Sequence, residues 1–171
     1  GKREVISSPN FASRLNIGMV HQHFKLVDDY TITENIILGI EPKKYLLGFI
    51  PVVNKKDASL KIAEISEKYG LKVNPEQRID TADVSVRQRV EILKMLYREA
   101  EILIFDEPTA VLTPQEIQFL MEILKGLRED GKTIILITHK LEEIKQVADR
   151  CAVLCRGKLT GIFNVSEIST S

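Results

Sequence analysis

The chain has 171 residues, 44% of them hydrophobic, and its 24 Lys and Arg residues balance its 24 Asp and Glu residues. This length suits one folded core, or one core with a small subdomain. The zero net charge argues against a nucleic-acid binder that relies on a broad basic face. No apolar run approaches the roughly 20 residues that cross a bilayer, and the N-terminal residues do not resemble a signal peptide. We therefore expect any association with a membrane to go through a partner.

The first part of the chain predicts two short strands. They are Lys2–Ile6 and Ile17–Val20, and the second leads directly to Gln22, a polar residue at the end of a strand. His21 and His23 flank this glutamine and share one face of an extended chain. No further Cys, His or acidic residue has the spacing of a zinc site, so we do not predict a metal centre on this pair.

A helix with an N-terminal capping box follows, from Thr31 with Glu34 three residues later to Gly39. The next segment, 41–54, contains two prolines and reads as irregular. It nevertheless contains five large apolar residues, which mark either a contact surface or a small satellite core under the loop. These residues are Tyr45, Leu46, Leu47, Phe49 and Ile50.

Two longer helices are predicted by apolar stripes. The first begins at Asp57 or Ser59 and ends at Gly70, and the second runs from Ser85 to about Arg98. Their apolar stripes comprise Ala58, Ile62, Ile65 and Tyr69 in the first helix, and Val90, Leu93, Leu96 and Tyr97 in the second.

The most informative stretch is Ile102–Phe105, a run of four apolar residues that predicts a strand buried on both faces. Asp106 and Glu107 follow at once, and Pro108 ends the strand. Open α/β sheets bind their ligands at this carboxyl edge. One carboxylate there can hold Mg²⁺, and the next can orient or deprotonate a water molecule. The alternative is a polar strand end followed by an ordinary turn.

Beyond this strand, Thr113 begins a helix with Pro at its first position and Glu three residues later. Thr133–Ile137 predicts another strand buried on both faces, which ends near His139. After a short helix, a hairpin is predicted at the C-terminus. Cys151 and Cys155 share one face of its first strand, so we expect two free, buried thiols, as in a reducing cytoplasm.

Strands and helices therefore alternate, which predicts an α/β fold with a parallel sheet. Three of the strands end near polar residues, namely Gln22, the pair Asp106 and Glu107, and His139. Because parallel strands present their carboxyl ends at one edge of the sheet, we expect these side chains to converge.

These residues resemble the motifs of the nucleotide-binding domain of ATP-binding-cassette (ABC) transporters, in order and spacing, over almost the whole chain. The matches are Gln22 for the Q-loop, Ser85 and Gln88–Val90 for the signature motif, Ile102–Glu107 for Walker B, Ala110–Thr113 for the D-loop and His139 for the switch histidine. Val20–Phe24 and Asp106–Glu116 look more specifically like the first of the two cassettes in bacterial importers of nucleosides and simple sugars.

The resemblance implies a role for each matching residue. Asp106 would bind the Mg²⁺ of ATP, Glu107 would act on the attacking water, and His139 would contact the γ-phosphate. Gln22 would sense the Mg²⁺ and the water, and would couple the site to the helical subdomain. Ser85 would donate to the ATP of a second cassette across a head-to-tail dimer, since a helix N-terminus favours phosphate.

Two departures from the family pattern affect this interpretation. The chain contains no G-x-x-x-x-G-K-S/T, the Walker A loop that cradles phosphates. The signature also lacks its glycine, because Val86 runs directly into Arg87, about two residues short of the family pattern. We expect that two residues are missing at this point. The competing interpretation is a truly shortened chain in which Ser85 and Gln88 form a capping box.

The expected fold is thus a P-loop NTPase-type (ABC ATPase) parallel sheet whose N-terminal Walker A part is missing. Residues 1–27 and 100–171 would form a partial ATPase core, and residues 28–99 a helical subdomain with the signature motif.

The resemblance implies that the parent protein hydrolyses ATP to drive import, on the cytoplasmic face of the membrane. Its partners would be a second cassette and membrane permease subunits, the latter contacted through the apolar residues of segment 41–54, and nucleic acid is not among them. Without Walker A, activity of this chain alone is not expected. A non-catalytic fragment and a soluble ABC ATPase of DNA repair or translation remain as alternatives.

Overall fold

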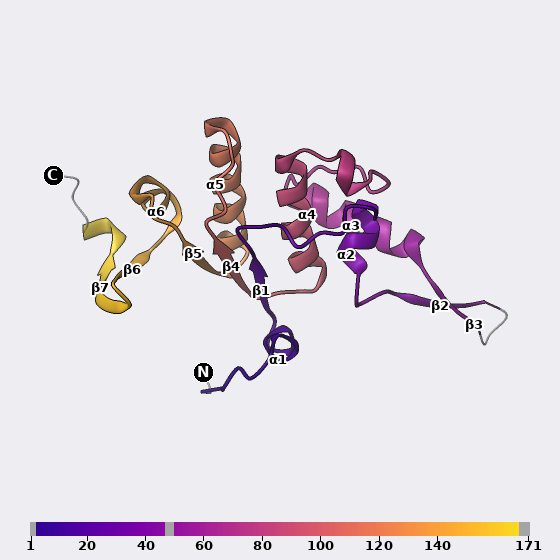
Figure 1. Cartoon of the computed structure of the whole chain (residues 1–171), viewed down its shortest axis with the longest axis horizontal. Helices are drawn as coiled ribbons and strands as arrows, with labels where there is room; N and C mark the ends of the chain where they lie inside the picture. Colours follow the sequence, from indigo (N-terminus) through magenta and orange to yellow (C-terminus); the bar gives the residue numbers. More distant parts are fainter. Residues whose placement is uncertain (1–2, 47–49, 168–171) are drawn as a thin grey trace.

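The computed structural model describes residues 3–46 and 50–167. Along the chain the elements are α1 (Pro9–Arg14), β1 (Ile17–Val20), α2 (Ile32–Ile37), β2 (Lys43–Leu46), β3 (Ile50–Val53), α3 (Lys55–Lys68), η1 (Ile79–Thr81), α4 (Val84–Tyr97), β4 (Ile102–Asp106), α5 (Pro114–Glu129), β5 (Thr133–Ile137), α6 (Leu141–Val147), β6 (Arg150–Cys155), β7 (Lys158–Asn164) and η2 (Val165–Glu167). In Figure 1 a central sheet separates a group of helices, α2 to α4, from a C-terminal hairpin, β6 and β7.

The central sheet is parallel, as the alternation of strands and helices predicts, and its strand order is β1-β4-β5. Strand β4 lies in the middle, because Met19 pairs with Ile104 on one side and Ile135 pairs with Ile104 on the other. The expected strand Lys2–Ile6 is wrong over its described residues. Residues 3–7 form no strand in the part of the chain that the structure describes, and Val5 and Ile6 are exposed.

The two faces of this sheet differ in burial. On one face Leu103 and Phe105 of β4 are fully buried in the core that also contains the inner stripe of α5. On the other face Ile135 and Ile137 of β5 are exposed. The expectation that β4 and β5 are buried on both faces is therefore wrong, because α4 and α5 cover only the first face within the described ranges. Along β4 and β5, more buried and more exposed residues therefore alternate, because successive side chains point to opposite faces of the sheet.

Gly18 lies in β1 where α4 approaches the sheet closely. A Cβ atom at Gly18 would lie 2.9 Å from Cγ and Sδ of Met95. This close approach joins the helical group to the sheet.

The helical group forms its own part of the core. Helix α2 has the predicted capping box, in which Thr31 accepts from the backbone of Glu34 and the Glu34 side chain accepts from the backbone of Thr31. Helix α3 starts earlier than predicted, at Lys55, because Asn54 caps it. The residues fully buried in this group are Ile32, Ile36, Ile62, Leu71, Ile79, Val90 and Ile92.

The segment expected to be irregular contains an antiparallel hairpin, β2 and β3, which projects from the end of the helical group (Figure 1). The expectation was wrong because two prolines in a sequence do not prevent pairing: Pro51 lies in β3 opposite Tyr45, and Pro42 accepts a hydrogen bond from Asn54 just outside the strands. The predicted contact residues Leu47 and Phe49 lie outside the described residues.

The C-terminal hairpin agrees with the prediction, with Arg156 and Gly157 in the left-handed conformation at its turn. Both cysteines are free, but Cys155 is exposed and Cys151 only half-buried. An irregularity in pairing between Val153 and Leu154 interrupts the alternation of side chains along β6, so the expected shared buried face does not form. In the described parts of the chain, no helix combines the length and apolar character needed to cross a bilayer.

Candidate active site

The carboxyl ends of β4 and β5 bring two of the predicted residues into contact. Glu107 follows β4 directly with a left-handed φ of 48°, and its backbone N–H donates to the carbonyl of Ile137 at the end of β5. Its side-chain Oε1 lies 3.0 Å from Nδ1 of His139. The glutamate side chain is 28% exposed and the histidine 71% exposed. A carboxylate thus holds an imidazole whose remaining edge faces solvent.

Asp106 is the last residue of β4 and lies beside Glu107, half-buried and in register with Ile137. Its carboxylate offers the hard oxygen ligands that Mg²⁺ prefers. Within the described ranges, no group of three or more His, Cys, Asp and Glu residues could hold a metal ion by itself. This donor set fits Mg²⁺ held by one or two carboxylates together with substrate phosphates.

Gln22 lies just beyond β1, the strand next to β4, and so belongs to the same edge of the sheet. Its side chain is exposed, and among the described residues no hydrogen bond joins it to Asp106, Glu107 or His139. The topology therefore places Gln22 at the expected edge without bringing it into contact with the other three residues.

Ser85 lies in the first turn of α4, where its hydroxyl accepts a hydrogen bond from Arg89 at 3.2 Å. The helix is capped by Asp83, which accepts from the backbone of Val86 at 2.8 Å. The capping box of Ser85 and Gln88, which was the competing interpretation, therefore does not form. Because Asp83 precedes Ser85 and can already reach the third helical N–H, it takes the N-cap position.

The two residues expected between Val86 and Arg87 stay a prediction. Val86 and Arg87 are consecutive in the sequence and in α4, and the backbone N–H of Arg87 donates to the carbonyl of Asp83 as in any helix. The shortened signature is thus accommodated in a continuous first turn.

Two buried polar residues of α4 reach the loops at the strand ends, and the sequence analysis did not assign them this role. The side-chain amide of Gln88 donates to the carbonyl of Pro108 at 2.7 Å, and Glu91 accepts from the backbone of Lys25 at 2.7 Å. Both side chains are buried. The sequence signal for these contacts was a polar residue on the buried side of a helix, since a buried polar group needs a hydrogen-bond partner.

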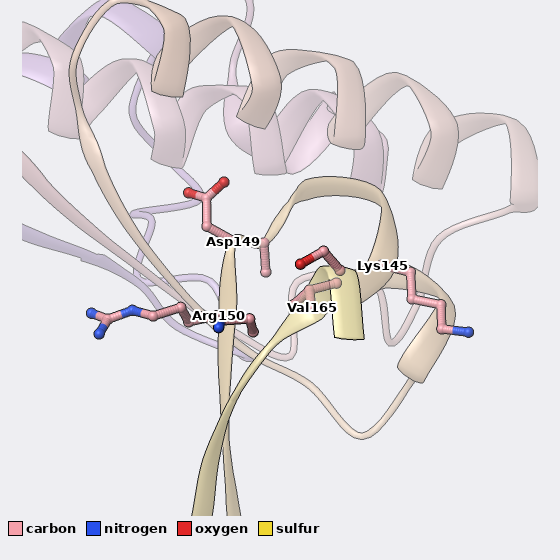
Figure 2. Close-up of a pocket in the computed structure, with 7 residues that line it drawn as sticks. Lys145, Asp149, Arg150 and Val165 are labelled. Carbon is pink, nitrogen blue, oxygen red and sulfur yellow. The ribbon is translucent and has the colours of Figure 1, made fainter. Parts of the chain in front are cut away.

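A cavity of about 540 Å³ extends from His139 along the apolar side of α6 and β6. A different cavity, of about 630 Å³, lies between the end of α6 and the start of β6. Figure 2 shows that the Lys145 and Arg150 side chains there point away from each other. The Asp149 carboxylate accepts a hydrogen bond from Arg128. The charges in this second cavity do not converge, so the strand ends remain the candidate site.

Known proteins resemble this chain in both sequence and fold. The chain is 60% identical over 158 residues to the nucleoside import ATP-binding protein NupA of Lactococcus lactis, and 54% identical over 158 residues to the guanosine import ATP-binding protein NupO of Bacillus subtilis. Each match covers 92% of this chain but 30% of the relative. The chain therefore spans about a third of the length of these relatives.

The dimeric structure of the ATP-binding cassette MJ0796, bound to ADP and Pi, superposes with a TM-score of 0.73 at 21% identity, covering 94% of this chain and 68% of that one. CbiO1 of Clostridium perfringens superposes with the same TM-score at 22% identity, covering 94% of this chain and 62% of that one. The fold is thus that of an ABC ATPase. The family model described as ABC transporter matches residues 4–110, and the chain belongs to the ABC transporter family of ATP-binding proteins.

Proposed function

We propose that this chain supplies catalytic residues to the ATP-hydrolysing subunit of an importer for nucleosides or simple sugars. One observation carries the proposal, the contact between Glu107 and His139 beside Asp106 at the carboxyl edge of parallel strands. The names of the relatives in Lactococcus and Bacillus support nucleosides as the substrate class.

In this proposal Glu107 orients the attacking water and accepts its proton, since its carboxylate is half-buried and in contact with His139. His139 presents the exposed edge of its ring to the γ-phosphate, where a hydrogen-bond donor stabilises developing negative charge. Asp106 and Gln22 hold the Mg²⁺ that, when bound, neutralises charge on the phosphates. Ser85 donates to the nucleotide of a second cassette in a head-to-tail dimer.

In this proposal different parts of the chain have different roles. Residues 1–27 and 100–171 act as part of the ATPase core, and residues 28–99 as the helical subdomain. The hairpin of β2 and β3 projects from this subdomain and exposes Tyr45 and Val53, so it is the surface that meets the permease subunits. In this proposal the protein lies at the cytoplasmic face of the membrane, where the permease subunits are.

Two measurements test this function. The printed sequence contains no phosphate-binding loop of the G-x-x-x-x-G-K-S/T type, so we expect the isolated chain to bind Mg-ATP weakly and to hydrolyse it little. A calorimetric titration that gives a micromolar dissociation constant would contradict that expectation and would exclude an inert chain.

The second measurement supplies the rest of the protein. We replace the matching segment of the Lactococcus relative with this chain and measure phosphate release. The folded chimaera should hydrolyse ATP, and the same chimaera carrying Asp106→Asn should lose most of its Mg²⁺-dependent activity. A folded chimaera that binds Mg-ATP but does not hydrolyse it would refute the proposed roles.

A further inference from the structure

A buried carboxylate joins the loops that follow β4 and β5. Glu143, in the first turn of α6, is only 3% exposed. Its Oε1 accepts a hydrogen bond of 2.6 Å from the hydroxyl of Thr109, which follows β4, and its Oε2 accepts one of 2.9 Å from the hydroxyl of Thr138, which follows β5. One side chain therefore bridges the loop after β4 and the loop after β5.

Lys140 determines the direction of these hydrogen bonds. Its Nζ donates to the hydroxyl oxygen of Thr109 at 3.0 Å, and its backbone N–H donates to the hydroxyl oxygen of Thr138 at 3.1 Å. Both threonine oxygens are thus acceptors for Lys140, and both hydroxyl protons are left for the Glu143 carboxylate, which can only accept. The ammonium also lies 3.4 Å from Oε1 of Glu143, so the buried charge is compensated.

The bridged loops are those that hold the candidate catalytic pair. His139 directly follows Thr138, and Glu107 lies two residues before Thr109. We propose that Glu143 is a positioning residue, which ties the two loops together so that Nδ1 of His139 stays on the Glu107 carboxylate. That this pair acts in ATP hydrolysis rests on the proposed function. That Glu143 keeps His139 on Glu107 concerns the structure of this chain alone.

The proposal has a spectroscopic consequence. An ionised carboxylate has no proton to donate, so the neutral imidazole of His139 must carry its proton on Nδ1 to bond to Glu107. A neutral imidazole without such a partner favours the tautomer that is protonated on Nε2. The tautomer of His139 therefore reports whether the two loops are held together.

The experiment measures the ring nitrogen resonances of His139 by NMR on this chain, without nucleotide, at a pH where the imidazole is neutral. The Glu107→Ala variant defines the spectrum of the released ring. We expect the Nδ1–H tautomer in the unaltered chain and a shift towards the Glu107→Ala spectrum in Glu143→Ala. The matched control is Glu142→Ala, which removes the exposed neighbouring carboxylate and should leave the tautomer unchanged.

Circular dichroism and thermal unfolding establish which variants are folded. If Glu143→Ala does not fold, the tautomer of His139 is measured in Thr138→Val and Thr109→Val instead. Each of these variants keeps the shape of the residue and removes one hydrogen bond to the Glu143 carboxylate. Retention of the Nδ1–H tautomer in the folded variants would overturn the proposal, as would an equal shift in Glu142→Ala. Because no nucleotide is present, these outcomes do not depend on whether the chain binds ATP, and their failure would leave the proposed function standing.

Discussion

Nδ1 of His139 lies 3.0 Å from Oε1 of Glu107, although 32 positions separate the two residues in the chain. The contact exists because β4 and β5 are neighbours in a parallel sheet and end at the same edge. It is reinforced by the backbone hydrogen bond from Glu107 to Ile137, which ties the start of the loop after β4 to the end of β5.

A first prediction concerns the chimaera with the Lactococcus relative. The Glu107→Gln variant should lose about 10²- to 10⁴-fold in the rate of phosphate release, which is the usual contribution of a general base. The dissociation constant of Mg-ATP should change little, because the amide keeps the size of the carboxylate. The control is His21→Ala, an exposed histidine on another loop. A Glu107→Gln chimaera that turns over at the unaltered rate would contradict the assigned role.

A second prediction concerns the start of α4. Asp83→Ala should lower the free energy of unfolding by about 1 kcal/mol, because it removes the side chain that caps the helix. Ser85→Ala should change it by less than about 0.5 kcal/mol, since Ser85 lies inside the first turn. Urea denaturation of both variants provides the comparison. The reverse order of effects would mean that Ser85 is the cap and that the helix begins later.

A third prediction concerns the dependence of stability on pH. Hydrogen bonds from Lys55 and from the backbone of Thr31 lower the pKa of Glu34 from 4.5 to about 2. This carboxylate therefore contributes stability that is fully present above pH 4.5 and is lost as the pH falls towards 2. The variant Glu34→Gln should be less stable by about 1 kcal/mol at neutral pH, with a difference that vanishes near pH 2.

The matched control for this prediction is Glu64→Gln, at an exposed position of α3. It should show the same dependence of unfolding free energy on pH as the unaltered chain. If Glu34→Gln instead remained less stable by the same amount at every pH, the effect of this residue would come from its shape and not from its charge.

A fourth prediction concerns the projecting hairpin of β2 and β3. Tyr45 is 60% exposed, so Tyr45→Asp should leave the fold intact and weaken the association with permease subunits. Leu60→Asp is the control, because Leu60 is similarly exposed, at 63%, but belongs to α3 and not to the hairpin. Co-purification of each variant chimaera with the membrane subunits measures the effect. Equal recovery of the two variants would place the docking surface elsewhere.

Local features of this chain were predictable from sequence because they depend on residues a few positions apart. The capping boxes at Thr31 and Thr113 form as predicted, and so does the turn at Arg156 and Gly157. The strand β4 and the two acidic residues at its end were predictable for a similar reason, since a short apolar run followed by proline ends a strand in most contexts.

Burial on the second face of the sheet was not predictable in the same way. An apolar run such as that of β5 shows which side chains can be buried, but the elements that cover them come from elsewhere in the chain. The contacts of Gln88 with Pro108 and of Glu143 with Thr109 were also missed, because each joins residues at least 20 positions apart.

The sequence by itself determined the order of strands and helices, the helix caps, the polar residues at the strand ends and the family motifs, all of which follow from local hydrogen bonds and hydrophobic periodicity. The tertiary structure decided which of these polar residues meet. The strand order β1-β4-β5 makes Glu107 and His139 neighbours. The packing of α4 and α6 buries Gln88 and Glu143 against the loops that follow the strands. The physical reason is that such contacts depend on distances through space, which a linear pattern of residues does not contain.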